Sequence, residues 1–206
     1  YYLLYGEAGL IVCQGSAHDM LEQQKPIIGV RLSDSVVIAL EQYSLLGTIP
    51  RVTLATALYA SESVYEDPIA VLAAVSGAET GADYAGSLDR TGDNRDEYYG
   101  GALLKGGRMV GRLSGGEMQL MNLLRGADQP MSMIVNGIAM NLERQGPPAV
   151  SVDLRGDVPV IDVKLCVLAS MTDAPFNSDD IAASLAARYD DLTAHCQSLG
   201  VDPFGY

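Results

Sequence analysis

Apolar and polar residues alternate along much of the second half of the chain. Between residues 158 and 168 the alternating positions are Val160, Asp162 and Lys164 on one side and Ile161, Val163 and Leu165 on the other. Successive side chains of a strand point to opposite faces, so this alternation predicts a strand with two different faces. Further strands are predicted at residues 102–105, 108–112, 131–135, 138–142 and 149–154.

Apolar residues recur at helical spacing near the end of the chain. Within residues 178–199 they are Ile181, Leu185, Leu192, Cys196 and Leu199. The spacing predicts a helix roughly 30 Å long with one buried face, which Gly200 ends. Helices are also predicted from about residue 17 to before Pro26, with Ser16 as N-cap, and at residues 34–46 and 54–65. Short apolar runs at residues 10–14 and 69–75 complete the pattern.

The order of these elements indicates the fold class and the domain organisation. Helices and strands come in runs, and the strands recur in pairs, which favours an α+β fold with mostly antiparallel or mixed sheets. Residues 77–97 are rich in Gly, Ala, Asp, Thr and Ser and predict a linker or mobile loop. It would separate an N-terminal α/β region, residues 1–76, from a C-terminal α+β region, residues 98–206. Because the chain opens without Met, we expect the first region to be incomplete at its start.

A hairpin followed by a capped helix is predicted at residues 102–126. Gly106 and Gly107 form a two-residue turn between two short strands, where both central residues need a positive φ. Ser114 and Glu117 have the spacing of a capping box at a helix start, and Gly126 closes the helix. Each glycine and polar residue of this stretch therefore has a structural role.

The string LSGGEMQ, residues 113–119, copies the signature loop of ABC-type ATPases. That loop places backbone N–H groups at a helix start against a nucleotide phosphate. An ATPase also needs a G-x-x-x-x-G-K-[ST] phosphate loop and an acidic metal ligand after an apolar strand, and the sequence contains neither. We therefore expect no nucleotide and no other cofactor.

Charge and residue usage exclude several classes of function. The net charge of −13 and the isoelectric point near 4.3 argue against binding to nucleic acid or to anionic lipid by charge alone. The sequence has no run of about 18 apolar residues, the length that a helix needs to span a bilayer. Cys13, Cys166 and Cys196 occur in apolar contexts, so we expect three small buried thiols rather than a disulfide. His18 and His195 lack metal-ligand spacing, and no metal site is expected.

The sequence also gives little evidence of a catalytic site. The sequence has no G-x-S-x-G nucleophile elbow, and its histidines have no obvious Ser or Cys partner. Glu62, Glu66 and Asp67 form an acidic cluster that could supply a carboxylate pair. In a chain with 26 acidic residues such a cluster is more typical of a solvated face, and we expect no catalytic residue.

Several stretches of the chain resemble, in the same order along the sequence, the landmarks of one family. The hairpin and helix start fit a pattern carried by Gly101, Ala102, Lys105, Val110, Gly111, Leu113 and Glu117. The stretch LGVDPFG, with Asp202, Phe204 and Gly205, follows the long predicted helix. Near the start lies LIVCQGSAHDML, residues 10–21, and between them lie VTL at residues 52–54 and DP at residues 67–68. Together they resemble the Ger(x)C family, the C subunits of bacterial spore germinant receptors.

The resemblance has departures. Arg112 stands where the family commonly has Trp, residues 1–9 match no landmark, and the strands that follow the last landmark in the family are absent. The resemblance implies separate α/β subdomains in a family-specific arrangement. It also implies that Gly101, Lys105, Gly111, Leu113, Glu117, Asp202, Phe204 and Gly205 have structural roles, with partner contact as a further possibility.

The function that the resemblance implies is that of a non-enzymatic receptor subunit in spore germination. Such a lipoprotein would be anchored by an N-terminal lipid on the outer face of the inner spore membrane, and would act with integral-membrane A and B subunits. Two other classes stay open on the residues alone. One is a secreted or surface enzyme with an unfamiliar carboxylate site, and the other is a stand-alone small-molecule binding module.

Overall fold

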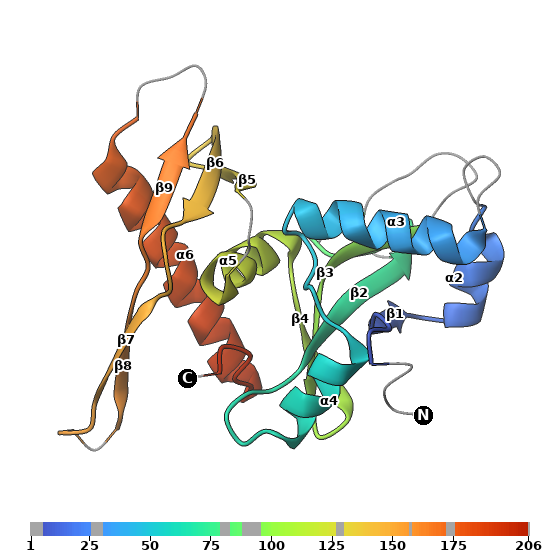
Figure 1. Cartoon of the computed structure of the whole chain (residues 1–206), viewed down its shortest axis with the longest axis horizontal. Helices are drawn as coiled ribbons and strands as arrows, with labels where there is room; N and C mark the ends of the chain where they lie inside the picture. Colours follow the sequence, from blue (N-terminus) through green and yellow to red (C-terminus); the bar gives the residue numbers. More distant parts are fainter. Residues whose placement is uncertain are drawn as a thin grey trace.

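The fold combines a mixed four-stranded sheet with a second, helix-covered sheet and a projecting hairpin (Figure 1). It is given by a computed structural model that describes residues 6–25, 31–78, 83–87, 96–126, 130–156, 158–171 and 176–205. The first sheet has the order β1-β2-β3-β4, with β1 at Ile11–Gln14, β2 at Ile69–Val75, β3 at Asp96–Lys105 and β4 at Arg108–Leu113. β1 and β2 are parallel, and the other two pairs are antiparallel.

β2 is the buried centre of the first sheet, which explains why it reads as a continuous apolar run. Helices α2 (Ala17–Gln23) and α3 (Leu32–Leu45) cover one face, where Met20 and Tyr98 are buried. The opposite face carries small residues such as Ala74 and Ala102, against which Ala85 packs. Helix α4 (Leu54–Glu62) precedes β2 and begins with a capping box between Thr53 and Thr56.

The two strands that flank the predicted linker are neighbours in one sheet. β2 precedes residues 77–97 and β3 follows them, and the two strands pair from Ile69 with Leu103 to Val75 with Asp96. Asp96 and Glu97, which were assigned to the linker, are buried strand residues. The first sheet therefore joins the predicted N-terminal region to the start of the predicted C-terminal region, and residues 77–97 do not separate two sheets.

The largest core lies between helix α5 (Gly115–Arg125), helix α6 (Ser178–Leu199) and a three-stranded sheet of order β5-β6-β9. The strands are β5 at Met131–Val135, β6 at Ile138–Arg144 and β9 at Val167–Ser170. The predicted apolar stripe of α6 is confirmed, because Ile181, Leu185, Leu192 and Cys196 are all buried. Gly200 ends the helix with a positive φ of 65°, also as predicted.

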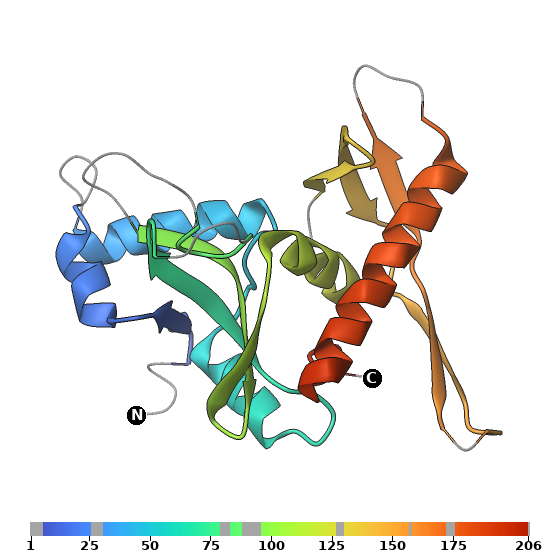
Figure 2. The same ribbon diagram turned by 180° about the vertical axis from the view of Figure 1, so that it is seen from behind.

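The strand expected at residues 158–168 is two strands with different partners. β8 (Val160–Lys164) pairs with β7 (Ala149–Asp153), whereas β9 pairs with β6. The β7–β8 hairpin extends away from the rest of the molecule (Figures 1 and 2), and every residue of β8 is exposed. The prediction of one continuous strand was wrong, because the chain changes partner between β8 and β9, and only the second half of the stretch packs against the core.

Several local predictions are confirmed. Gly106 and Gly107 have φ values of 57° and 74°, as the two-residue turn requires. Ser114 and Glu117 form the reciprocal capping box, and Gly126 ends α5 in the left-handed conformation. The thiols differ from expectation, because Cys196 is buried but Cys13 is half-buried and Cys166 is exposed. Cys166 lies between β8 and β9, where the chain changes strand partner.

Candidate functional site

Residues of the sequence landmarks, distant along the chain, come together where α6 ends. The turn end of the β3–β4 hairpin, the start of α5, residues 66–67 and the loop after α6 meet there. We call this cluster the motif junction and define it as Glu66, Asp67, Lys105, Glu117, His195 and residues 200–205. Figure 2 shows the C-terminal end of α6 beside α5 and the hairpin.

Asp67 and Asp202 are joined by two hydrogen bonds, one between their backbones and one from a backbone to a side chain. The N–H of Asp67 donates to the carbonyl oxygen of Asp202 at 2.7 Å, and the N–H of Asp202 donates to Oδ2 of Asp67 at 2.8 Å. The other carboxylate, Oδ1 of Asp202, accepts the N–H groups of Phe204 and Gly205 at 2.9 and 3.2 Å, which closes a tight turn. These bonds fix the loop after α6 to the segment before β2.

Lys105 ties the hairpin to the same loop. Its Nζ donates to the carbonyl oxygen of Gly200, the residue that ends α6, and lies 3.7 Å from Oδ2 of Asp67. A lysine at a helix C-terminus is favoured by the helix dipole. The ion pair itself contributes little, because the Lys105 side chain is 53% exposed and water screens the charges. Lys105 therefore joins the hairpin to the loop mainly through its hydrogen bond to Gly200, and less through the ion pair with Asp67.

Glu117 joins the start of α5 to α6. Its Oε2 accepts the N–H of Ser114 at 2.7 Å, and the Ser114 hydroxyl accepts the N–H of Glu117 at 3.2 Å. Its other oxygen, Oε1, lies 2.7 Å from Nδ1 of His195. The carboxylate thus completes the capping box and bonds the neighbouring helix. The sequence predicted the first role but gave no sign of the second.

Two motif glycines permit close approach in this part of the fold. A Cβ on Gly111 would lie 2.3 Å from Cδ1 of Leu199, and one on Gly101 would lie 2.6 Å from Sδ of Met118. Leu113 is fully buried in the large core. Gly101, Gly111 and Leu113 are therefore packing residues, whereas Lys105 and Gly205 are exposed and Phe204 is partly exposed.

The acidic cluster before β2 is not the solvated face that was expected. Glu66 forms an ion pair with Arg125 at 2.8 Å, and Asp67 accepts from Asp202 as described. Only Glu62 of the three is exposed at the end of α4. Two of the three acids therefore connect the segment before β2 to α5 and to the loop after α6.

The thiol next to His195 is not poised as a nucleophile. Burial, together with the nearby carboxylates of Glu117 and Asp202, raises the pKa of Cys196 to about 12. A reactive cysteine needs the opposite environment, with positive charge and partial exposure. Cys196 acts as a small apolar residue of the core.

Three backbone donors at the start of α5 are occupied by protein atoms. Ser114 donates its N–H to Glu117, Gly115 donates to the carbonyl oxygen of Asp83, and Glu117 donates to Ser114. A Cβ on Gly115 would also lie 2.2 Å from the ring of Tyr99. The LSGGEMQ helix start therefore serves mainly internal hydrogen bonds and packing.

A buried polar group lies under α2, away from the motif junction. Nε2 of Gln24 donates to Oδ2 of Asp96 at 2.8 Å, and both side chains are buried. Burial raises the pKa of Tyr98 well above its usual range, and the adjacent Asp96 charge and hydrogen bond add to this effect. Tyr98 is therefore a neutral phenol that helps to fix Asp96, the first residue of β3.

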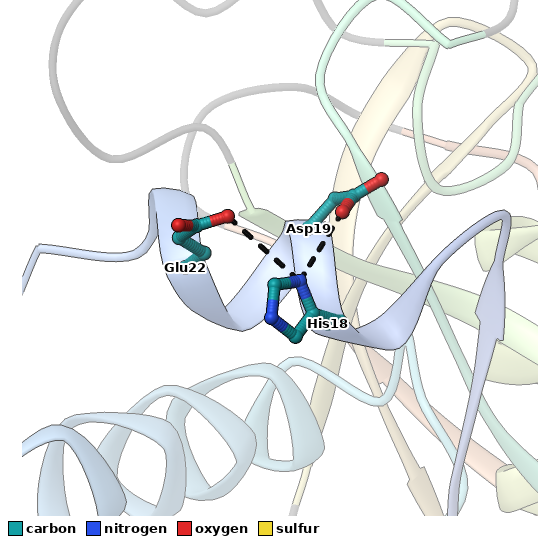
Figure 3. A group of neighbouring side chains, drawn as sticks. All are labelled: His18, Asp19 and Glu22. Atoms are coloured by element: carbon teal, nitrogen blue, oxygen red, sulfur yellow. Dashed lines mark hydrogen bonds and ion pairs between the residues drawn. The ribbon is translucent and has the colours of Figure 1, made fainter.

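His18, Asp19 and Glu22 form an exposed group on α2 (Figure 3). Nδ1 of His18 lies 3.3 Å from Oδ1 of Asp19 and 3.8 Å from Oε2 of Glu22, and all three side chains are more than 60% exposed. Their ligand atoms lie within 4.8 Å of one another, so one helix turn could offer three ligands. Exposed groups of this kind are common without an ion, and nothing else in the described residues converges on them.

Comparison with known proteins found a likeness in structure but no match in sequence. No protein-family model matches the chain, and no curated protein sequence matches it. The crystal structure of the GerBC protein matches 93% of this chain with a TM-score of 0.56 at 16% sequence identity. The chain has a GerBC-like fold. It covers 54% of the GerBC chain, so it spans about half of that protein's length.

The GerBC-like fold agrees with the α+β class and with the family resemblance drawn from the sequence. Where the family commonly has Trp, Arg112 places its guanidinium 4.4 Å from the ring centre of Tyr84, a cation–π contact. Within the described ranges, no helix combines the length and the apolar character needed to cross a bilayer.

Proposed function

We propose that this chain is part of the C subunit of a spore germinant receptor. The observation that carries the proposal is the GerBC-like fold, which extends over 93% of the chain. At 16% identity this likeness concerns the fold, and the receptor role is the step beyond it. The motif residues are the second support, because residues of separate sequence landmarks contact one another in the fold.

Three of the landmarks contribute to one junction. The hairpin landmark supplies Lys105 and Glu117, the DP landmark supplies Asp67, and the last landmark supplies Asp202. These residues belong to separate helices, strands and loops, yet all match landmarks of the same family. Their contact with one another in the fold would explain why they occur together. The contacts among these residues therefore support the family resemblance, and the GerBC-like fold supports it separately.

The proposed role is binding rather than catalysis. The acids and the histidine of the motif junction are engaged in caps, backbone bonds and ion pairs. The subunit would act by contact with integral-membrane A and B subunits, held at the outer face of the inner spore membrane by a lipid on a cysteine upstream of this chain. Its exposed junction residues, Lys105 and Gly205, are candidates for partner contact.

The test is co-purification from spores. The full-length, lipidated protein with an affinity tag would be solubilised in mild detergent, and candidate A and B subunits would be identified by mass spectrometry. An equally abundant, unrelated spore lipoprotein with the same tag serves as the control for non-specific membrane capture.

We expect A and B subunits with the tagged protein and not with the control, together with a germination defect when the gene is deleted. Absence of both subunits from a preparation in which the tagged protein is intact and lipidated would contradict the proposal. Normal germination of the deletion strain in every nutrient tested would contradict it independently.

A further inference from the structure

A cleft with a volume of about 500 Å³ lies between α4 and α5. The end of α3, residues 50–52 and the segment that leads into β2 complete its walls. All of the lining residues lie between Ser44 and Gly126, so neither end of the chain forms a wall. Small-molecule sites in proteins have volumes of roughly 300–1,000 Å³. The cleft therefore has the size of a site for a small organic molecule.

Short side chains on α4 keep the cleft open. The wall that α4 contributes includes Ala55, Thr56 and Ala60, which leave space that longer side chains would fill. On the opposite side, Met118 and Met121 of α5 are buried core residues that form the inner end of the cleft. Methionine side chains are flexible and adapt to the shape of a neighbour. The inner end is therefore apolar and adaptable.

The rim of the cleft carries an aromatic ring. Tyr59 lines the cleft but is 74% exposed, so most of its ring surface is in contact with water. An aromatic side chain buries roughly 150–250 Å² when it packs fully, which makes its burial strongly favourable. Val52 is half-buried in the neighbouring wall. A ligand with an apolar body would cover both side chains.

Charge selects the class of ligand. The charged residues of the lining are Arg51, Arg125 and Glu66, which gives two positive charges against one negative charge. Glu66 and Arg125 form an ion pair at 2.8 Å and largely neutralise each other, so the net charge of the lining equals that of Arg51. This sign is opposite to that of the whole chain, which carries −13. The cleft thus favours an anion with a single charge.

The end of α3 holds the Arg51 side chain in the cleft wall. Nε of Arg51 donates to Oγ of Ser44 at 2.8 Å, and both residues line the cleft. A guanidinium has five N–H donors in one plane, a geometry that matches the two oxygens of a carboxylate. Near Gly126, Nη1 of Arg144 donates to the carbonyl oxygen of Leu124 at 3.0 Å, which offsets the negative end of the α5 dipole.

We infer that the cleft between α4 and α5 binds a small organic monocarboxylate with an apolar body. The carboxylate lies at Arg51, and the apolar body lies between Ala55 and the ring of Tyr59. This site is separate from the proposed partner contacts of a receptor subunit, so the inference goes beyond the proposed function and does not depend on it.

The experiment titrates the 206-residue chain with three probes that share one apolar body. Phenylbutyrate, phenylbutanol and phenylbutylamine carry a negative, a neutral and a positive head group at neutral pH. Two-dimensional NMR of the isotope-labelled protein gives the affinity of each probe, and the amide signals that shift give its location. The comparison among the probes separates the effect of charge from that of apolar contact.

Two variants of the cleft have matched controls elsewhere on the surface. Arg51→Gln removes the charge, and Arg155→Gln removes the same charge from the loop between β7 and β8. Ala55→Trp fills the cleft from α4, and Ala187→Trp makes the same change on α6. All four side chains are exposed, so we expect each variant to keep the NMR spectrum and the Tm of a folded chain.

Phenylbutyrate is expected to bind with a Kd on the order of 1 mM or below, and at least about tenfold more tightly than phenylbutylamine. The shifted amides should be those of the cleft, such as Val52, Thr56 and Asn122. Arg51→Gln should reduce the preference for the acid over the amine to about twofold or less. Ala55→Trp should weaken all three probes by about tenfold or more, and both controls should stay within about twofold of the unchanged chain.

Several results overturn the inference. These are no binding of phenylbutyrate at roughly 10 mM, equal affinity for the acid and the amine, or shifted amides centred outside the cleft. An unchanged head-group preference in Arg51→Gln, or unchanged affinity in Ala55→Trp, does the same. If a variant fails to fold, the three probes on the unchanged chain still decide. A failed co-purification with receptor subunits leaves all of these measurements unaffected.

Discussion

The capping box of α5 allows a direct test of the structural role of the LSGGEMQ stretch. Ser114→Ala removes the hydroxyl that accepts the N–H of Glu117, and we expect it to lower the free energy of unfolding by about 0.5–2 kcal/mol. Glu117→Gln keeps an oxygen for the N–H of Ser114, so its cost is smaller. Glu117→Ala loses that bond and the contact with His195, and we expect about 2–3 kcal/mol.

Thermal and denaturant unfolding measure these differences. For a chain of this size, about 1 kcal/mol lowers Tm by roughly 2–4 °C. Ser151→Ala, on the exposed face of β7, is the matched Ser-to-Ala control and should stay within about 0.5 kcal/mol of the unchanged chain. A double-mutant cycle of Glu117→Ala with His195→Ala should give a coupling energy of about 1 kcal/mol, since the two side chains bond each other.

A germination assay on the same variants distinguishes the structural role from a chemical one. We expect germination to decline only as far as Ser114→Ala protein fails to accumulate in spores. If Ser114→Ala protein is as stable and abundant as the unchanged protein but germination is lost, the structural interpretation of this helix start is refuted. A larger stability loss in Glu117→Gln than in Ser114→Ala would refute the assignment of the two bonds.

Three further predictions follow from single positions. Gly100→Ala should destabilise the protein by about 2 kcal/mol or more in chemical unfolding, because φ is 87° and its Cβ would lie 2.3 Å from the carbonyl oxygen of Leu113. Iodoacetamide at pH 8, read by peptide mass spectrometry, should label exposed Cys166 first and Cys196 only after unfolding, because burial raises the pKa of Cys196 to about 12. Calorimetry should detect no ATP binding, since the chain has no phosphate loop and three of the donors at the start of α5 are occupied.

The raised pKa of Cys196 also sets the sign of an alkaline effect. In the unfolded chain this thiol ionises near its usual pKa of about 8.5, whereas in the folded protein it stays neutral up to about pH 12. The unfolded state therefore binds fewer protons between these values, and the free energy of unfolding falls as pH rises through that window. Below about pH 8.5 the group contributes no pH dependence.

Local patterns were the part of this fold that the sequence could predict. The turn at Gly106 and Gly107, the capping box of Ser114 and Glu117, and the buried stripe of α6 each depend on residues within one turn or one helix. Such interactions are nearly independent of the remaining fold, so spacing alone predicts them. The α+β class followed from their order.

Pairing between distant strands was not predictable in the same way. The composition of residues 77–97 suggested a boundary, yet β2 and β3 on either side of it pair in one sheet. Strand pairing depends on which edges and faces meet in three dimensions, and composition does not report it. The alternation at residues 158–168 likewise predicted a two-faced strand but not the change of partner that leaves half of its apolar face uncovered.

By itself the sequence determined which residues form turns, caps and helix faces, and which of them match the landmarks of one family. It could not show that Asp67 bonds Asp202, that Glu117 reaches His195, or that Lys105 lies at the end of α6, because these partners are separated by 78 to 135 positions. Only the tertiary structure brings them together, since the packing of α6 against the hairpin sets their distances. The same packing covers Leu165, Val167 and Ala169 but leaves Ile161 and Val163 of the same alternating row exposed, which the alternation alone could not show.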